Sequence, residues 1–158
     1  MRNRKAKVYF ERVPGAPDPA VCEVKRRCRF SEVDAMAIVW HGRYATFFEE
    51  ASAELGRKVG LSYRDFFESG LRAPIVEFHI DYLQPLYLDE EFIVRALLIW
   101  HEGARINTEY HIVKQDGTRA AGGYTVQLLV DAATGDPCYV TPDLLATCRD
   151  RWKAGAFR

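Results

Sequence analysis

The spacing of hydrophobic residues changes from a helical period to a strand period along this chain. Over about residues 39–59, apolar residues recur every three or four positions, as on one face of an α-helix. This apolar stripe consists of Tyr44, Phe47, Phe48, Ala51 and Leu55. After about residue 70 the period becomes two, which is typical of strands with one buried face. We therefore predict a long amphipathic helix that packs against a β-sheet.

Residues with strong terminal preferences mark the ends of three predicted helices. Gly60 is suited to end the long helix, because glycine readily adopts the left-handed conformation found there. Ser62 is predicted to cap a second, short helix that runs to about Glu68. Thr141 is predicted to cap a terminal helix with Pro142 at its first position.

Alternating apolar and polar residues predict the strands. The expected strands cover residues 21–30, 76–82, 92–100, 104–112 and 120–130, with a further short strand at 7–10. Asp116-Gly117 predicts a hairpin between two of them. Glu77, His79 and Asp81 alternate with the apolar residues of their strand, so we expect them on its outer or subunit-facing side.

The order of these elements predicts an α+β fold, in which one helix covers one face of an antiparallel sheet. The length of 158 residues suits a single domain over residues 1–158. Within it, residues 1–20 are expected to be an irregular N-terminal extension, because residues 14–19 are rich in proline and glycine. Residues 141–158 are expected to form the C-terminal helix.

Composition and charge exclude several classes of protein. Lysine plus arginine and aspartate plus glutamate both number 22, so no net charge attracts nucleic acid or an anionic membrane. No segment approaches the roughly 20 apolar residues of a membrane span, and the N-terminus lacks a secretory signal pattern. The four cysteines form no CxxC pair or metal-site spacing. A cytoplasmic protein with free thiols is the simplest interpretation, and one structural disulfide is the alternative.

The candidate chemistry lies where the first long strand passes into the long helix. Asp34 lies in this connection, and a helix N-terminus carries unpaired N–H groups and the positive end of the helix dipole. A carboxylate beside such an oxyanion site is a plausible hydrolase centre. The alternative is that Asp34 caps the helix. The sequence contains no Gly-x-Ser-x-Gly, phosphate-binding-loop, Gly-x-Gly-x-x-Gly or His-Glu-x-x-His motif.

Around Asp34 the sequence resembles the hotdog-fold acyl-CoA thioesterases of the 4-hydroxybenzoyl-CoA thioesterase type. Their signature is approximately Asp-x-x-Gly-[Ile/Val]-Val-[Tyr/Trp]-x-x-x-Tyr, and the matching residues are Asp34, Ile38, Val39, Trp40 and Tyr44. The resemblance continues through residues 47–51 and 76–86 and covers about residues 22–130. Two positions depart from it: Ala37 stands where the family usually has glycine, and Val33 stands where many members have threonine or cysteine.

This resemblance implies a sheet wrapped around a central helix and hydrolysis of an acyl-CoA. Asp34 would act as nucleophile or as general base, and the backbone N–H of His41 would polarise the thioester carbonyl. No metal or redox cofactor is expected, since coenzyme A is part of the substrate. The family forms its pocket between subunits, so a homodimer or homotetramer is expected.

Three further residues are predicted to bind substrate: Trp40, Tyr44 and Glu49. Glu49 shares a helix face with small residues, where it contacts substrate or orients water; the alternative is an ordinary solvated glutamate. Tyr44 and the aromatic residues near it are alternatively core residues. Trp100 is a further candidate for lining the pocket.

Three alternative functions are considered. A hydratase of this fold would pair the aspartate with a histidine five positions later, where this chain has Val39. A non-catalytic acyl-thioester-binding protein and a thioesterase that acts on an acyl-carrier protein are the other two.

Overall fold

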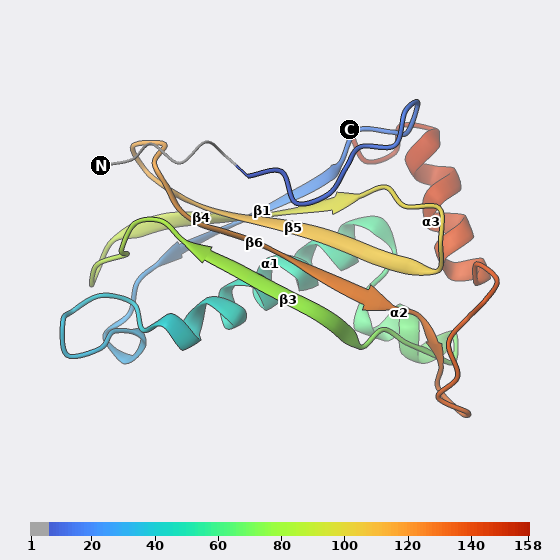
Figure 1. Cartoon of the computed structure of the whole chain (residues 1–158), viewed down its shortest axis with the longest axis horizontal. Helices are drawn as coiled ribbons and strands as arrows, with labels where there is room; N and C mark the ends of the chain where they lie inside the picture. The colour runs from blue at the N-terminus through green and yellow to red at the C-terminus, as the bar shows by residue number, and fades with distance from the viewer. Residues whose placement is uncertain (1–6) are drawn as a thin grey trace.

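Five antiparallel strands make one curved sheet in the computed structural model, which describes residues 7–158 (Figure 1). The strands are β1 (Ala20–Arg27), β3 (Ile75–Tyr82), β4 (Glu91–Ile99), β5 (Arg105–Lys114) and β6 (Arg119–Leu128). Their order across the sheet is β1-β4-β5-β6-β3, so β1 and β3 are the edges. Two short strands, β2 (Leu71–Arg72) and β7 (Val130–Asp131), pair with each other beside the main sheet.

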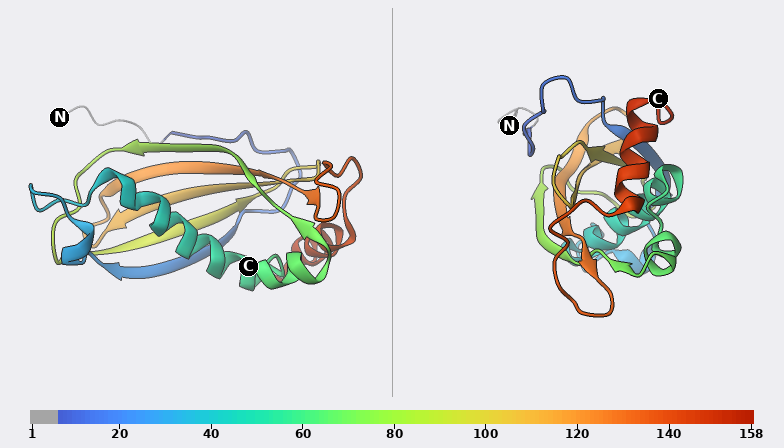
Figure 2. Two further views of the ribbon diagram at one scale, coloured as in Figure 1. Left: turned by 90° about the horizontal axis from the view of Figure 1, so that it is seen from below. Right: turned by 90° about the vertical axis from the view of Figure 1, so that its right-hand side faces the viewer.

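Three α-helices accompany the sheet. They are α1 (Tyr44–Val59), α2 (Tyr63–Glu68) and α3 (Asp143–Lys153), and short 3₁₀ helices lie at Phe30–Glu32 and His41–Arg43. The sheet curves around α1, while α2 and α3 lie at one end of the molecule (Figures 1 and 2). The predicted α+β arrangement, an antiparallel sheet around one long helix, is confirmed.

The apolar stripe of α1 is buried against the sheet as predicted. All five of its residues are buried, and Phe48 stacks on Tyr110 of β5 with ring centroids 4.3 Å apart. Gly123 of β6 makes this approach possible. A Cβ atom there would lie 2.8 Å from the Phe48 ring and 2.2 Å from the carbonyl oxygen of His79, so any side chain would force α1 and β3 away.

The long helix begins later than the period predicts. Residues near 39 are not helical, because Ala37 has a φ of +60° and Trp40 is extended. The backbone N–H of Val39 donates to the carbonyl oxygen of Leu86 instead of to a helical acceptor. A 3₁₀ helix that starts at His41 then leads directly into α1 at Tyr44.

The predicted ends of the helices are mostly confirmed. Gly60 ends α1 with a φ of +79°. Ser62 caps α2: its hydroxyl accepts from the Asp65 N–H, and the Asp65 carboxylate accepts from the Ser62 N–H. The prediction for α3 is wrong by one residue, because Pro142 is still extended and occupies the cap position expected for Thr141.

The terminal helix closes the end of the core beyond β4. Trp152 of α3 contacts Trp100 with ring centroids 5.2 Å apart, and both side chains are buried. Trp100 is therefore a core residue, which is the alternative to its lining the substrate pocket. At the opposite end, Gly117 has a φ of +85° in the hairpin between β5 and β6, as Asp116-Gly117 predicted.

The N-terminal segment, residues 7–19, runs over the face of the sheet opposite α1 (Figure 1). The short strand predicted at residues 7–10 does not form. Instead, the Tyr9 hydroxyl donates to the Asp81 carboxylate at 2.8 Å, and the Tyr9 ring contacts Tyr124 at 5.4 Å between centroids. Near the other end of the segment, the indole N–H of Trp152 donates to the Asp18 carbonyl oxygen at 2.7 Å.

This N-terminal segment buries polar residues that the sequence pattern places on the outer face. Glu109 of β5 is only 3% exposed, and its carboxylate lies 3.9 Å from the Arg12 guanidinium and 3.8 Å from the His111 ring. The face is thus an internal layer, covered by irregular chain.

The edge strand β3 leaves apolar side chains in contact with solvent. Ile75, Val76, Phe78 and Tyr82 are each about half exposed. Within residues 7–158, β3 pairs only with β6, so the hydrogen-bonding groups on its other edge have no strand partner. An apolar, unpaired edge is a template for pairing with another chain.

The state of the cysteines and the length of the helices bear on two further predictions. All four cysteines are free thiols, so the alternative of a disulfide is not realised. No helix in the described part of the chain is long and apolar enough to cross a membrane.

Candidate active site

The loop that carries Asp34 is a tight turn held by its own backbone. The Asp34 N–H donates to the Ile38 carbonyl oxygen at 2.9 Å, and the Ala37 N–H donates to the Asp34 carbonyl oxygen at 3.0 Å. The Leu88 N–H donates to the Ala37 carbonyl oxygen at 3.0 Å, which ties this loop to the chain before β4. The position of Asp34 is therefore fixed by bonds on both sides of the turn.

The turn requires a left-handed residue at Ala37, where the resembled family has glycine. A non-glycine residue there costs on the order of 1–2 kcal/mol. We expect Ala37→Gly to raise the free energy of unfolding by about 0.5–1 kcal/mol, since glycine removes this strain but gains entropy in the unfolded chain. That gain corresponds to a Tm increase of about 2–4 °C in thermal unfolding.

Ala35→Gly is the matched control for this change. Ala35 lies in the same loop and is exposed, and its φ is not positive. Glycine at this position should lower stability slightly, because it only makes the unfolded chain more flexible. Equal Tm changes in the two variants would contradict the assignment of strain to Ala37.

The Asp34 side chain does not cap the long helix. Its Oδ1 accepts from the Met36 N–H at 2.8 Å, within the same turn. The residue before α1 is Arg43, whose side chain makes no capping hydrogen bond. Among the described residues no partner reaches Oδ2, and Asp34 is half-buried. The capping alternative is therefore wrong, and one carboxylate oxygen is available for chemistry.

The peptide group between Trp40 and His41 is held in a fixed orientation. The Arg43 N–H donates to the Trp40 carbonyl oxygen at 2.9 Å, and the His41 N–H points the opposite way because the peptide is trans. No acceptor for this His41 N–H occurs within residues 7–158. The next peptide is held by Tyr82, whose hydroxyl donates to the His41 carbonyl oxygen at 2.8 Å.

Asp34 and His41 line the same hollow, which has a volume of about 350 Å³. Tyr44 also lines it and contacts Tyr82 edge-on, with ring centroids 4.9 Å apart. Burial raises the pKa of Tyr44 to about 12, so its hydroxyl stays protonated at neutral pH. The structure thus brings together three of the five predicted site residues, and Tyr44 belongs to both the core and the wall of the hollow.

Trp40 and Glu49, the other two predicted site residues, lie elsewhere. Trp40 does not line the Asp34 hollow. Its side chain is 47% exposed and contacts the His41 ring, with ring centroids 5.0 Å apart. The Trp40 ring lies directly over Gly42, since a Cβ atom at this position would lie 2.3 Å from the ring. Glu49 lies one turn further along α1 and lines a second hollow.

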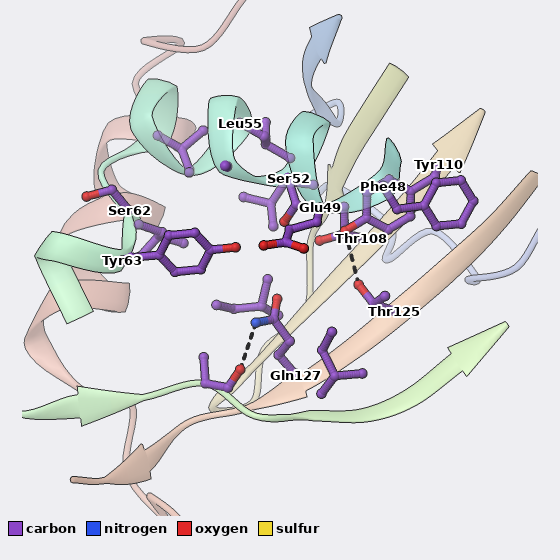
Figure 3. Close-up of a pocket in the computed structure, with 18 of the residues that line it drawn as sticks. Phe48, Glu49, Ser52, Leu55, Ser62, Tyr63, Thr108, Tyr110, Thr125 and Gln127 are labelled. Carbon is purple, nitrogen blue, oxygen red and sulfur yellow. Dashed lines mark hydrogen bonds between the residues drawn. The ribbon is translucent and has the colours of Figure 1, made fainter. Parts of the chain in front are cut away.

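The second hollow, of about 500 Å³, lies between α1, α2 and the strands β3, β5 and β6 (Figure 3). The small-residue face of α1, consisting of Ala45, Glu49, Ser52 and Gly56, lines it. Besides Ser62, which caps α2, the hydrophilic residues of the other walls are Tyr63, Thr108, Tyr110, Thr125 and Gln127. Sequence reasoning missed these five. The available signal was the pair of hydroxyl groups at Thr108 and Tyr110, within an otherwise apolar strand face.

A buried ion pair lies beside the turn that carries Asp34. The Arg26 side chain, 7% exposed, contacts the carboxylates of Glu32, 10% exposed, and Glu50 of α1. Its guanidinium also lies 4.6 Å from the centroid of the Phe47 ring. The Glu32 carbonyl oxygen accepts from the Trp40 N–H at 2.9 Å. Arg26 therefore connects β1, α1 and the segment next to Asp34.

Comparison with known proteins assigns the chain to a family. The model of the family described as "Thioesterase-like superfamily" matches residues 28–148. The chain belongs to this superfamily, and its fold is the hotdog fold that the sequence predicted. It is a thioesterase, an enzyme that hydrolyses thioesters.

Three similar proteins illustrate the relationship. The putative acyl-CoA thioesterase YneP of Bacillus subtilis is 28% identical over 69% of this chain and 79% of its own length. The 1,4-dihydroxy-2-naphthoyl-CoA hydrolase of Thermosynechococcus vestitus is 29% identical over 63% of this chain and 68% of its own. The structure of a DHNA-CoA thioesterase from Staphylococcus aureus superposes with a TM-score of 0.71 at 24% identity, covering 85% of this chain and 95% of that one.

Proposed function

We propose that this thioesterase hydrolyses an acyl-CoA to a free acid and coenzyme A, with Asp34 and the His41 N–H at the reaction centre. The observation that carries the proposal is that this carboxylate and this unpaired N–H line one hollow. Relatives named for acyl-CoA substrates support the substrate class.

The His41 N–H donates a hydrogen bond to the thioester oxygen, on which negative charge develops as the carbonyl carbon is attacked. Its preset orientation is the kind of stabilisation used in oxyanion holes. The start of the helical run from His41 into α1 adds the positive end of a dipole at the same place.

Asp34 can act by either of two routes. As a nucleophile, its oxygen bonds to the carbonyl carbon, the carbon–sulfur bond breaks, and the coenzyme A thiolate leaves and takes a proton from water; a second water then cleaves the mixed anhydride. As a general base, it takes a proton from the water that attacks directly. Neither route needs a metal or redox cofactor. Tyr44 lines the reaction centre and contacts the bound thioester. Trp40, exposed beside the His41 ring, contacts the substrate from outside this hollow.

A second copy of the chain is proposed to cover the β3 edge and complete the site. Ile75, Val76, Phe78 and Tyr82 form an apolar strip there, and pairing the two β3 strands would bury it. Tyr82 also lines the Asp34 hollow, so the partner subunit would lie beside the reaction centre. A homodimer, or a homotetramer of two such dimers, follows. The four free thiols support a cytoplasmic location.

The test of this proposal is thiol release by the purified protein from a panel of short-chain, long-chain and aromatic acyl-CoA substrates. The same acyl groups on an acyl-carrier protein form a second panel. We expect hydrolysis of at least one acyl-CoA with a kcat/KM of about 10⁴ M⁻¹s⁻¹ or more. Release only from the acyl-carrier protein would identify the substrate as an acyl group on a carrier protein. Tight binding without release from either panel would contradict the proposal and favour the non-catalytic alternative.

A further inference from the structure

We propose that Tyr82 is a positioning residue of this thioesterase, whose hydroxyl holds the backbone at His41 so that the His41 N–H keeps its direction toward the thioester oxygen. This inference rests on the proposed function, since it takes that N–H as the donor at the reaction centre. It adds the group that keeps the donor in place. That group lies on β3, 41 positions further along the chain.

Two peptide groups meet at the Cα atom of His41. The first, between Trp40 and His41, carries the N–H, and its carbonyl oxygen accepts from the Arg43 N–H at 2.9 Å. The second, between His41 and Gly42, has its carbonyl oxygen held by the Tyr82 hydroxyl at 2.8 Å. Each peptide group is planar but can rotate about the bond that joins it to this Cα atom. The direction of the N–H is therefore fixed only while both carbonyl oxygens are held.

The local hydrogen bond in this segment is a weak restraint. It belongs to a single turn of 3₁₀ helix, His41–Arg43, and such turns have poorer hydrogen-bond geometry than an α-helix. Gly42 lies inside the turn, and glycine leaves the backbone unusually free. Within residues 7–158, no side chain caps this turn or the start of α1. The turn therefore needs a restraint from outside the segment, and the Tyr82 hydroxyl supplies one.

Tyr82 is itself held firmly by the sheet. It is the last residue of β3 and is paired there with β6. The next two N–H groups, of Leu83 and Gln84, both donate to the Ala120 carbonyl oxygen, at 2.9 and 3.0 Å. The Tyr82 ring packs edge-on against the buried ring of Tyr44, with centroids 4.9 Å apart. The end of β3 thus places this hydroxyl at the start of α1 (Figure 1).

The Tyr82 hydroxyl acts as a donor at neutral pH. Its partner is a carbonyl oxygen, which can only accept. Burial raises the pKa of Tyr82 above its ordinary value, so the hydroxyl keeps its proton. Because Tyr82 also lines the Asp34 hollow, the alternative is that its hydroxyl contacts the substrate directly. The two roles differ in one respect: a positioning residue orders the backbone of the free protein.

Tyr82→Phe removes the hydroxyl and keeps the ring that packs against Tyr44. We expect kcat for the best acyl-CoA substrate to fall about tenfold to a hundredfold, because a donor that changes direction stabilises the transition state less. KM should stay within about threefold, since the other contacts with the substrate remain. Tyr82 is half exposed, so the variant should fold, with a Tm lower by no more than about 4 °C.

Backbone order parameters from ¹⁵N relaxation of the free protein measure the restraint itself. In the wild type, the N–H groups of His41 and Gly42 should have values of about 0.85, as in rigid backbone. In Tyr82→Phe both values should fall toward about 0.6, as in flexible backbone. Tyr87→Phe is the matched control, because Tyr87 is also half exposed and its hydroxyl makes no hydrogen bond within residues 7–158. It should leave kcat and both order parameters unchanged.

The outcomes separate this inference from the proposed function, because the order parameters need no substrate. Unchanged order parameters in Tyr82→Phe would overturn the inference even if kcat falls, since the hydroxyl would then act on the substrate. Lower order parameters with an unchanged kcat in an active enzyme would also overturn it. Lower order parameters in a protein that releases no thiol from any acyl-CoA would support the restraint by Tyr82 and contradict only the proposed function.

Discussion

Replacing Asp34 by asparagine is expected to lower kcat/KM for acyl-CoA hydrolysis by about a hundredfold to ten-thousandfold, the usual range for loss of a general base or its equivalent. Asparagine keeps the shape of the side chain and an oxygen that can accept from the Met36 N–H, so the turn should persist. It removes the charge that a nucleophile or base needs. Thiol-release kinetics, together with a Tm within about 2 °C of the wild type, would check this.

Asp89→Asn provides the matched control for the Asp34 variant. Asp89 lies in the neighbouring segment before β4, has a φ of +66° that asparagine tolerates, and does not line the Asp34 hollow. Its activity should stay within about twofold of the wild type, as for a surface substitution. Comparable activity of Asp34→Asn and Asp89→Asn would refute a chemical role for Asp34.

Repeated turnover in ¹⁸O-labelled water would reveal Asp34 as a nucleophile. If Asp34 attacks the thioester, a mixed anhydride forms and water then cleaves it. When water attacks the Asp34 carbonyl of this anhydride, the label enters the Asp34 carboxylate. If Asp34 is a general base, the label enters only the released acid. Mass spectrometry of the peptide that contains Asp34 would detect the difference.

Replacing Arg26 by methionine should give the largest loss of stability among the changes considered, about 3–5 kcal/mol. Methionine keeps the length and apolar contact with Phe47 but leaves the Glu32 carboxylate, 10% exposed, buried without its partner. Glu50 is 43% exposed and can turn to solvent, so it adds little to the loss. Denaturant unfolding, and a Tm lower by about 10 °C, would measure the effect.

The double variant Arg26→Met with Glu32→Gln tests the cause of that loss. It removes the unpaired charge, so it should recover most of the lost stability if the uncompensated carboxylate is responsible. Arg57→Met is the control for an exposed ion pair, here with Glu54, and should lower stability far less than Arg26→Met, because solvent screens exposed charges. A loss as small for Arg26 as for Arg57 would contradict a structural role for the buried pair.

The features predicted correctly from the sequence are those decided by neighbouring residues. The apolar stripe of α1, the stop at Gly60 and the cap at Ser62 depend on side chains within one or two helical turns. That Asp34 and His41 lie close together was also accessible to sequence reasoning, because they are seven positions apart and the resemblance covers both.

The features that escaped prediction depend on contacts distant in the sequence. The late start of α1 follows from the bond between Val39 and Leu86, which competes with helical hydrogen bonding. Glu109 is buried because Arg12 and its neighbours cross β5. The second hollow joins Glu49 with Gln127, and no local pattern relates two positions that far apart.

The N-terminal segment affects which assembly is accessible. Two subunits could associate edge to edge through β3 or back to back through the sheet face opposite α1. The second arrangement would require residues 7–19 to leave that face, with loss of the Tyr9–Asp81 hydrogen bond and the Arg12–Glu109 contact. It would also transfer Glu109 from its present partners to a new interface, where an unpaired carboxylate is costly. Of the two oligomers expected, the segment therefore favours the dimer, because it hinders association of further subunits through this face.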